Sequence, residues 1–297
     1  MIKLFWNTHN QIIPTSKNPS NEDIINYKWG LYHKDYSDKW IYYLLQKIQF
    51  KVINNKEDIE SEDSLIIVDS SVEKKKDFYN KLRLICSKVF LIHLGDETGR
   101  YDLSAIYNNC AFVWKTFCIN KYFQNPKVTC LPIGYKSGVK LHENKNGRKF
   151  KWSFIGTPHK SSRHDLLFQL SNIKPSFFYK THNFNEKILE VDEMNEILSS
   201  TIFAPCPNGF VHPETYRLYE ALECECIPIV ESAYNYYDRL FPNNPFIKID
   251  KWSDAKKKIM IMDEHQIDKK KEECKSWWKN HKNYIQEDIL KKIKYEK

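Results

Sequence analysis

The chain has 297 residues, 41% of them hydrophobic and 28% charged, and a formal net charge of +8. This length suits two domains of about 100–150 residues, and the apolar content excludes an intrinsically disordered chain. Aliphatic runs such as Leu65–Val68 are far shorter than the roughly 20 apolar residues that span a bilayer, and the first residues lack the apolar region of a signal peptide, so we expect a cytoplasmic protein.

The first half of the chain alternates short apolar runs with amphipathic segments. This alternation is typical of a parallel sheet that helices cover on both faces. Strands are predicted at Ile2–Trp6, Ser64–Asp69, Lys88–His93, Ala111–Trp114 and Val128–Pro132, and helices at Asp38–Ile48 and Val72–Ile85.

A polar stretch between Lys136 and Lys151 contains two glycines and predicts a linker. A second alternating series follows the linker. Its predicted strands are Trp152–Ile155, Ser176–Tyr179, Ile202–Ala204, Ile227–Val230 and Phe246–Ile249, and its predicted helices are Ser161–Leu170, Val191–Leu198, Pro213–Glu223 and most of the chain from Asp254 onward. We therefore expect one α/β domain over residues 1–145, a second over residues 146–265, and terminal helices over residues 266–297.

The eight cysteines form no C-x-x-C pair, and most lie in or beside apolar stretches. We expect reduced, buried thiols in a cytoplasmic protein. We expect no metal site, because Cys224, Cys226 and His212 fit no standard zinc spacing. Neither G-x-G-x-x-G nor a P-loop pattern occurs, which disfavours a dinucleotide-binding Rossmann enzyme and a P-loop NTPase.

Lysines are concentrated in the last 47 residues, where 14 lysines accompany nine acidic residues. Trp252, Trp277 and Trp278 lie among these lysines, so a basic nucleic-acid-binding surface with stacking aromatic rings is one alternative function. The acidic residues interrupt the lysines throughout, which favours the solvated face of a helix and no nucleic-acid partner.

The segment from Phe203 to Val230 is the most informative about chemistry. A loop with Asn208 and Gly209 follows a predicted strand, and a predicted helix follows the loop. A helix N-terminus in this place is suited to bind an anion. Arg217 and Glu220 are three residues apart on that helix, so they lie on one side of it. Arg217 could pair with a phosphate and Glu220 could accept hydrogen bonds from a ribose diol, but an ordinary surface ion pair explains the same spacing.

This segment resembles the signature of the exostosin-like glycosyltransferases, a GT-B-type, GT47-like family. The matching residues are Pro207-Asn208-Gly209, then Arg217-Leu218-Tyr219-Glu220-Ala221, then Ile227-Pro228-Ile229-Val230. Glu225 stands where the family usually has a small residue. Two other stretches, residues 125–135 and 152–163, are consistent with the same family, so the resemblance covers about residues 85–240.

The resemblance implies an α/β GT-B fold, in which two Rossmann-like domains face each other across a cleft and the terminal helices pack back toward the first domain. It implies an enzyme of polysaccharide biosynthesis that transfers a sugar from a nucleotide-sugar donor, usually a UDP-sugar, to a glycan or glycolipid hydroxyl, with at most peripheral membrane association. No D-x-D motif occurs, so we expect a metal-independent enzyme without a cofactor. The implied donor-binding residues are Gly156, Lys160, Ser161, Arg163, Asn208, Gly209, Arg217 and Glu220.

An inverting transfer needs a carboxylate or an imidazole that takes the proton of the acceptor hydroxyl. The predicted strand Lys88–His93 ends beside two carboxylates, and we expect Asp96 to be this base, with Glu97 as the second candidate and His93 as the third. The alternative is that Asp96 caps the following turn. Gly30 and His33 are further candidates on the acceptor side. A non-catalytic module of the same fold that binds a nucleotide or a glycan is the other alternative function.

Overall fold

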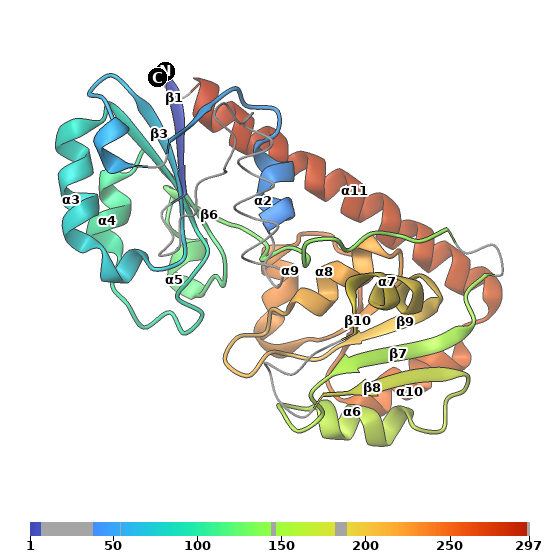
Figure 1. The fold of residues 1–297 in the computed structure, drawn as a ribbon. Helices are drawn as coiled ribbons and strands as arrows, with labels where there is room; N and C mark the ends of the chain where they lie inside the picture. The colour runs from blue at the N-terminus through green and yellow to red at the C-terminus, as the bar shows by residue number, and fades with distance from the viewer. Residues whose placement is uncertain (7–37, 54, 144–146, 182–188, 296–297) are drawn as a thin grey trace. The chain divides into compact units, whose positions relative to one another are not determined.

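The computed structural model describes residues 1–6, 38–53, 55–143, 147–181 and 189–295. The chain forms two compact units (Figure 1). The N-terminal unit consists of Met1–Ile133 and Asn283–Lys297, and the C-terminal unit consists of Gly134–Lys282. Among the described helices, none is long and apolar enough to cross a membrane.

The N-terminal unit contains a six-stranded parallel sheet with the strand order β2-β1-β3-β4-β5-β6. Its strands are β1 (Ile2–Trp6), β2 (Lys51–Ile53), β3 (Ser64–Asp69), β4 (Lys88–His93), β5 (Phe112–Lys115) and β6 (Val128–Cys130). Its helices are α2 (Asp38–Leu45), α3 (Lys76–Ile85), α4 (Ser104–Asn109) and α5 (Asn120–Phe123), and the last residues of α11 (Glu264–Tyr295) join this unit.

Successive side chains of each strand point to opposite faces of the sheet. On one face, Leu65 and Leu91 pack in a buried cluster with Leu82 of α3 and Tyr107 of α4. On the other face, the Nε1 atom of Trp114 donates a hydrogen bond to a carboxylate oxygen of Asp288 in α11, at 3.3 Å. The central strands carry uninterrupted apolar runs, Leu65–Val68 in β3 and Val89–Ile92 in β4, because helices cover both faces.

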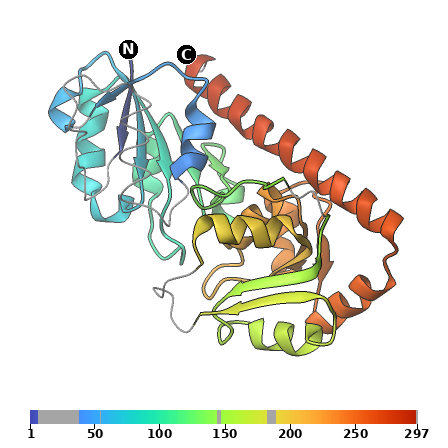
Figure 2. The same ribbon diagram turned by 45° about the vertical axis from the view of Figure 1, so that its right-hand side comes forward.

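The C-terminal unit contains a five-stranded parallel sheet with the strand order β11-β10-β9-β7-β8. Figure 2 shows the light green β7 beside the yellow-green β8. The chain moves from β7 outward to β8 and then returns to β9 on the other side of β7. In such sheets, ligands bind beyond the carboxyl ends of the two strands where the direction reverses, here β7 and β9. The strands are β7 (Phe150–Gly156), β8 (Ser176–Lys180), β9 (Thr201–Cys206), β10 (Ile227–Glu231) and β11 (Ile247–Ile249). The helices are α6 (Arg163–Leu170), α7 (Val191–Ser199), α8 (Tyr216–Glu223), α9 (Tyr236–Leu240), α10 (Trp252–Ile261) and the first part of α11.

The tryptophans of the basic C-terminal segment are part of the packed interior. Trp252 and Trp278 are buried. Trp277 packs edge-to-face on Phe241, with ring centroids 5.3 Å apart, and stacks on His281. These rings are therefore not available to stack on nucleic-acid bases, which removes the observation that favoured a nucleic-acid-binding surface.

The longer predicted strands and helices are confirmed, with differences at their ends. The helix predicted from Pro213 begins instead at Tyr216. The carbonyl oxygen of Pro213 accepts a hydrogen bond from the hydroxyl of Tyr237 at 2.8 Å, and the buried Glu214 carboxylate accepts hydrogen bonds from two tyrosine hydroxyls. The helix predicted from Val72 begins with a separate 3-10 turn, and α2 ends three residues early. The short elements β2, α4, α5 and α9 were not predicted.

The prediction of reduced thiols is wrong for two cysteines. Cys118 and Cys130 form a disulfide. The other six cysteines are free and buried, as predicted.

We expect the free energy of unfolding to depend on pH through His281. Its ring stacks on Trp277, with centroids 4.7 Å apart, and burial lowers its pKa from 6.5 to about 4. Because the unfolded chain then binds the proton more readily, stability is lost as the pH falls from about 6.5 toward 4. We expect His281→Phe, which keeps a stacked ring, to reduce this loss by about 2 kcal/mol between pH 7 and pH 4.5. Urea unfolding at both pH values measures it, and an equal loss in wild type and variant would contradict the assignment.

Candidate functional site

Arg217 lies against the carboxyl end of β7. Its Nη2 atom donates a hydrogen bond to the carbonyl oxygen of Ile155 at 2.8 Å, and its guanidinium carbon lies 4.5 Å from the ring centroid of Phe154. Gly156 has a φ of +143°, and a Cβ atom at this position would lie 2.7 Å from Nη2 of Arg217. Gly156 is therefore needed so that the arginine can pack against the strand end.

Arg163, the first residue of α6, brings a second positive charge to this strand end. Its Nη1 atom donates to the carbonyl oxygen of Thr157 at 3.1 Å, while its buried Nε atom has no hydrogen-bond partner among the described residues. Burial and then the charge of Arg217 lower the pKa of Arg163 to about 10, and the carboxylate of Glu231 opposes this shift. Burial also lowers the pKa of Arg217. Two neighbouring guanidinium groups in a partly buried place are suited to bind an anion.

The loop after β9 completes this edge of the sheet. A Cβ atom on Gly209 would lie 2.5 Å from the carbonyl oxygen of His212, so only glycine fits this turn. The backbone N–H of Asn208 donates to a carboxylate oxygen of Glu231 at 2.7 Å. Oδ1 of Asn208 and Oγ1 of Thr215 are buried and have no hydrogen-bond partner within the described part of the chain. Buried polar atoms are normally paired, so these two atoms indicate a place for a ligand or for water.

Glu220 lies one turn into α8, on the same side of the helix as Arg217. Burial raises the pKa of its carboxyl group, and the charges of Arg217 and Lys136 oppose this shift. After the donor-binding role that the sequence resemblance implies here, we use the term donor edge for the residues at the carboxyl ends of β7, β9 and β10, which are Gly156, Arg163, Asn208, Gly209, Thr215, Arg217, Glu220 and Glu231.

The other two predicted donor residues lie in the turn before α6. Ser161 is exposed and has a φ of +54°, and Lys160 is partly buried. Sequence reasoning missed Thr215 and Glu231. Glu231 is the last residue of β10 and follows an apolar run, which is the signal that could have identified it.

The predicted base lies at the carboxyl edge of the N-terminal sheet. Asp96 has a φ of +56°, and its Oδ1 atom accepts a hydrogen bond from the backbone N–H of Arg100 at 3.1 Å, so it caps the following turn. Its Oδ2 atom is buried and has no hydrogen-bond partner among the described residues. Below this loop, the buried ammonium group of Lys115 donates to the carbonyl oxygens of Gly95 and Thr116. One carboxylate oxygen therefore holds the turn, and the other, unpartnered among the described residues, indicates a place for a ligand or for water.

The other predicted acceptor-side residues differ in their surroundings. Glu97 is exposed. His93 is fully buried, and its Nδ1 atom lies 2.7 Å from the hydroxyl of Tyr107. Burial, assisted by the charge of Lys115, holds the pKa of His93 well below its usual value, so its ring is neutral. Gly30 and His33 lie outside the described residues.

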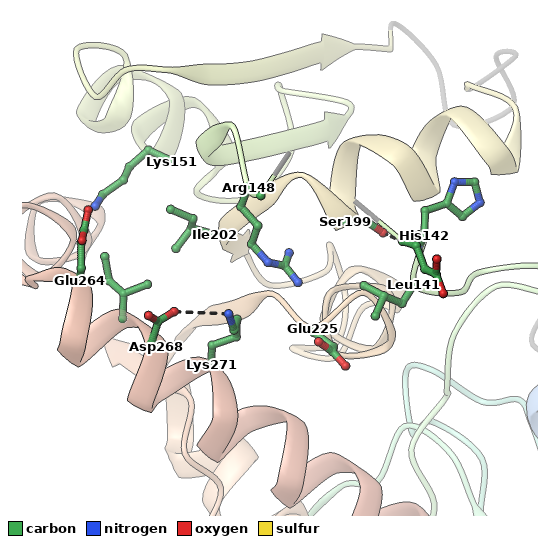
Figure 3. Close-up of a pocket in the computed structure, with 13 residues that line it drawn as sticks. Leu141, His142, Arg148, Lys151, Ser199, Ile202, Glu225, Glu264, Asp268 and Lys271 are labelled. Atoms are coloured by element: carbon green, nitrogen blue, oxygen red, sulfur yellow. Dashed lines mark hydrogen bonds and ion pairs between the residues drawn. The ribbon is translucent and has the colours of Figure 1, made fainter. Parts of the chain in front are cut away.

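A pocket of about 540 Å³ lies at the amino ends of the strands of the C-terminal sheet, where β7 and β9 begin, opposite the donor edge (Figure 3). No predicted donor residue lines it. Arg148 on its wall donates hydrogen bonds to the carbonyl oxygens of Leu198, Thr201 and Cys224. These contacts tie the ends of α7 and α8 to the sheet, so Arg148 has a structural role.

Comparisons with known proteins identify the family. Residues 135–296, which include every residue of the donor edge, match the family model described as RXYLT1 C-terminal domain. No curated protein matches the chain. The solved structure described as "Crystal Structure of alpha1,3-Fucosyltransferase" has a TM-score of 0.51 and 11% identity, and the match covers 99% of this chain and 90% of that chain. That likeness shows the fold alone and confirms the predicted GT-B type. The family match covers more than half of the chain, which therefore belongs to the glycosyltransferase family described as RXYLT1 C-terminal domain.

Proposed function

We propose that this glycosyltransferase binds a nucleoside diphosphate sugar, most simply a UDP-sugar, at the donor edge and transfers the sugar to a glycan hydroxyl. The observation that carries this proposal is the pair Arg163 and Arg217 at the carboxyl ends of β7 and β9, together with unpartnered buried atoms of Arg163, Asn208 and Thr215 among the described residues. A diphosphate supplies the negative charge that the two arginines attract and the oxygen atoms that accept hydrogen bonds from Arg163 and Thr215.

The same groups account for catalysis in this proposal. Negative charge accumulates on the diphosphate as the bond between the sugar and the phosphate oxygen breaks. Arg217 is held in place by Ile155 and Phe154, and the N-terminus of α8 begins beside Thr215, so positive charge is already oriented before the reaction. The arginines stabilise the leaving diphosphate, and we propose a reaction that does not depend on a metal ion.

We assign the acceptor side to Asp96 and propose an inverting reaction. The support is the Oδ2 atom of Asp96, which is buried without a hydrogen-bond partner in the described part of the chain. A carboxylate oxygen of this kind can take the proton of the acceptor hydroxyl as the hydroxyl oxygen attacks the sugar. Neutral, fully buried His93 is less suited to this role.

Replacing Glu220 should have opposite effects on stability and on donor binding. Burial raises the pKa of the Glu220 carboxyl group above 4.5. The folded protein therefore loses stability as the pH rises through this raised pKa and the carboxyl group ionises. We expect Glu220→Gln to stabilise the ligand-free protein at pH 7. We also expect it to weaken UDP binding about tenfold, because a charged hydrogen bond to the ribose contributes roughly 1.5–3 kcal/mol. Thermal unfolding and calorimetry measure the two effects. Unchanged UDP affinity would remove Glu220 from the site.

A donor screen tests the function itself. The intact protein is incubated with UDP-xylose, UDP-glucuronate, UDP-galactose or UDP-N-acetylglucosamine, with and without EDTA, and released UDP is measured. We expect one donor to be consumed clearly faster than the others, with the same rate in EDTA. UDP binding without consumption of any donor would favour a non-catalytic module, and loss of the rate in EDTA would contradict metal independence.

A further inference from the structure

Two aromatic side chains are exposed to solvent beside the donor edge. Phe210 follows β9 and is 79% exposed, and Tyr234 follows β10 and is 91% exposed. The two strands are neighbours, with Cys206 paired to Val230, so both loops leave the same edge of the sheet. Val211, next to Phe210 in the chain, is also exposed. Single exposed aromatic residues are common in proteins, but these two follow neighbouring strands on loops that also carry donor-edge residues.

Hydrogen bonds and a ring contact join the loop after β9 to the segment after β10. The hydroxyl of Tyr236 donates a hydrogen bond to Glu214 at 2.9 Å, and the hydroxyl of Tyr237 donates to the carbonyl oxygen of Pro213 at 2.8 Å. The ring of His212 packs edge-to-face on that of Tyr236, with centroids 4.8 Å apart. The bond between Asn208 and Glu231 connects the same loops. The loops that carry the two exposed rings are therefore held in place by these contacts.

The backbone at Tyr234 is also unusual. Tyr234 and Asn235 have φ values of +56° and +51°. An aromatic residue rarely adopts this left-handed conformation. Such conformations persist only where the surrounding structure enforces them, and they cluster at ligand sites. In this loop, the residue with the left-handed backbone conformation is Tyr234, whose side chain is exposed to solvent.

Resting on the proposed donor site, we propose that Phe210 and Tyr234 bind the sugar rings of the acceptor glycan. The C–H face of a sugar packs on an aromatic ring, and the tyrosine hydroxyl adds a hydrogen bond. The sugar of the donor has to be enclosed to keep water from the reaction. An acceptor chain instead continues into solvent. A largely exposed ring covers one face of a bound sugar and leaves the other face in contact with solvent. Such rings are therefore suited to bind the acceptor glycan.

The test measures binding of two ligands to the full chain. A panel of methyl glycosides and disaccharides of xylose, glucose, galactose, N-acetylglucosamine and glucuronate is titrated by NMR into the protein saturated with UDP. UDP affinity is measured separately by calorimetry. The variants are Phe210→Ala, Tyr234→Ala and Tyr234→Phe. Phe168→Ala is the matched control, because Phe168 is an exposed aromatic residue of the same unit, 73% exposed, and belongs to α6 and to neither loop.

We expect a panel saccharide that binds the wild type to lose at least about tenfold in affinity in Phe210→Ala and Tyr234→Ala. Tyr234→Phe should retain most of the affinity, and Phe168→Ala all of it. UDP affinity should stay within about twofold in every variant. The proposal is overturned if no saccharide binds the wild type better than the alanine variants, or if UDP affinity falls as much as saccharide affinity, which would place the rings in the donor site. Failure of the wild type to bind UDP would instead contradict the proposed function.

Discussion

Replacing Arg217 by lysine should lower kcat by about 100-fold or more while raising the KM for the donor much less. Lysine keeps the positive charge but cannot stack on Phe154 and bind the carbonyl oxygen of Ile155 with one group while presenting another nitrogen to the diphosphate. The charge on the leaving diphosphate is largest in the transition state, so the loss falls on turnover. Initial rates at varied UDP-sugar concentration measure both constants.

Arg239→Lys is the matched control for this change, because Arg239 is an exposed arginine of the same unit, on α9. Thermal unfolding has to show that Arg217→Lys remains folded, since Arg217 also packs against β7. A folded Arg217→Lys enzyme with wild-type turnover would give this arginine a structural role only.

Replacing Asp96 by asparagine should lower kcat by about 10²–10⁴-fold without changing UDP affinity. Asparagine can still accept the hydrogen bond from the backbone N–H of Arg100, so the turn should remain formed. It cannot take a proton from the acceptor hydroxyl, so the loss falls on turnover. Initial rates with the donor identified by the screen measure kcat, and calorimetry measures UDP affinity.

The neighbouring carboxylate provides the control for the base. Glu97 is exposed and adjacent, and Glu97→Gln should leave turnover unchanged. An inactive Glu97→Gln variant beside an active Asp96→Asn variant would move the role by one residue. A product that retains the anomeric configuration of the donor would contradict the inverting reaction for either residue.

The sequence predicted the two sheets well because their central strands are buried on both faces. Ser64–Asp69 and Lys88–His93 have the predicted bounds, because each contains an uninterrupted run of buried apolar residues, Leu65–Val68 or Val89–Ile92. The β/α alternation was therefore sufficient for the fold class. Short elements such as β2 and α5 contain only three or four residues, which is too few for a hydrophobic period to identify them.

The donor edge was predicted in part. Arg217 and Glu220 follow a recognisable motif, but the start of their helix was misplaced because Pro213 and Glu214 are bound by tyrosines of a later segment. Local sequence cannot show such tertiary hydrogen bonds. Thr215 and Glu231 were missed for the same reason. Thr215 and Glu231 reach the site only because the ends of particular strands lie side by side, and the strand order cannot be predicted from any single segment of the sequence.

UDP binding to the wild type and to the Arg163→Gln/Arg217→Gln double variant, measured by calorimetry, tests the location of the donor site most directly. Both substitutions keep a planar side chain that can donate hydrogen bonds, and they remove the positive charge together with part of the length and some of the N–H donors of each arginine. We expect the wild type to bind UDP and the double variant to bind it at least about 100-fold more weakly, since two charged hydrogen bonds contribute roughly 3 kcal/mol or more. Equal affinity in the two folded proteins would contradict a diphosphate site at the carboxyl ends of β7 and β9.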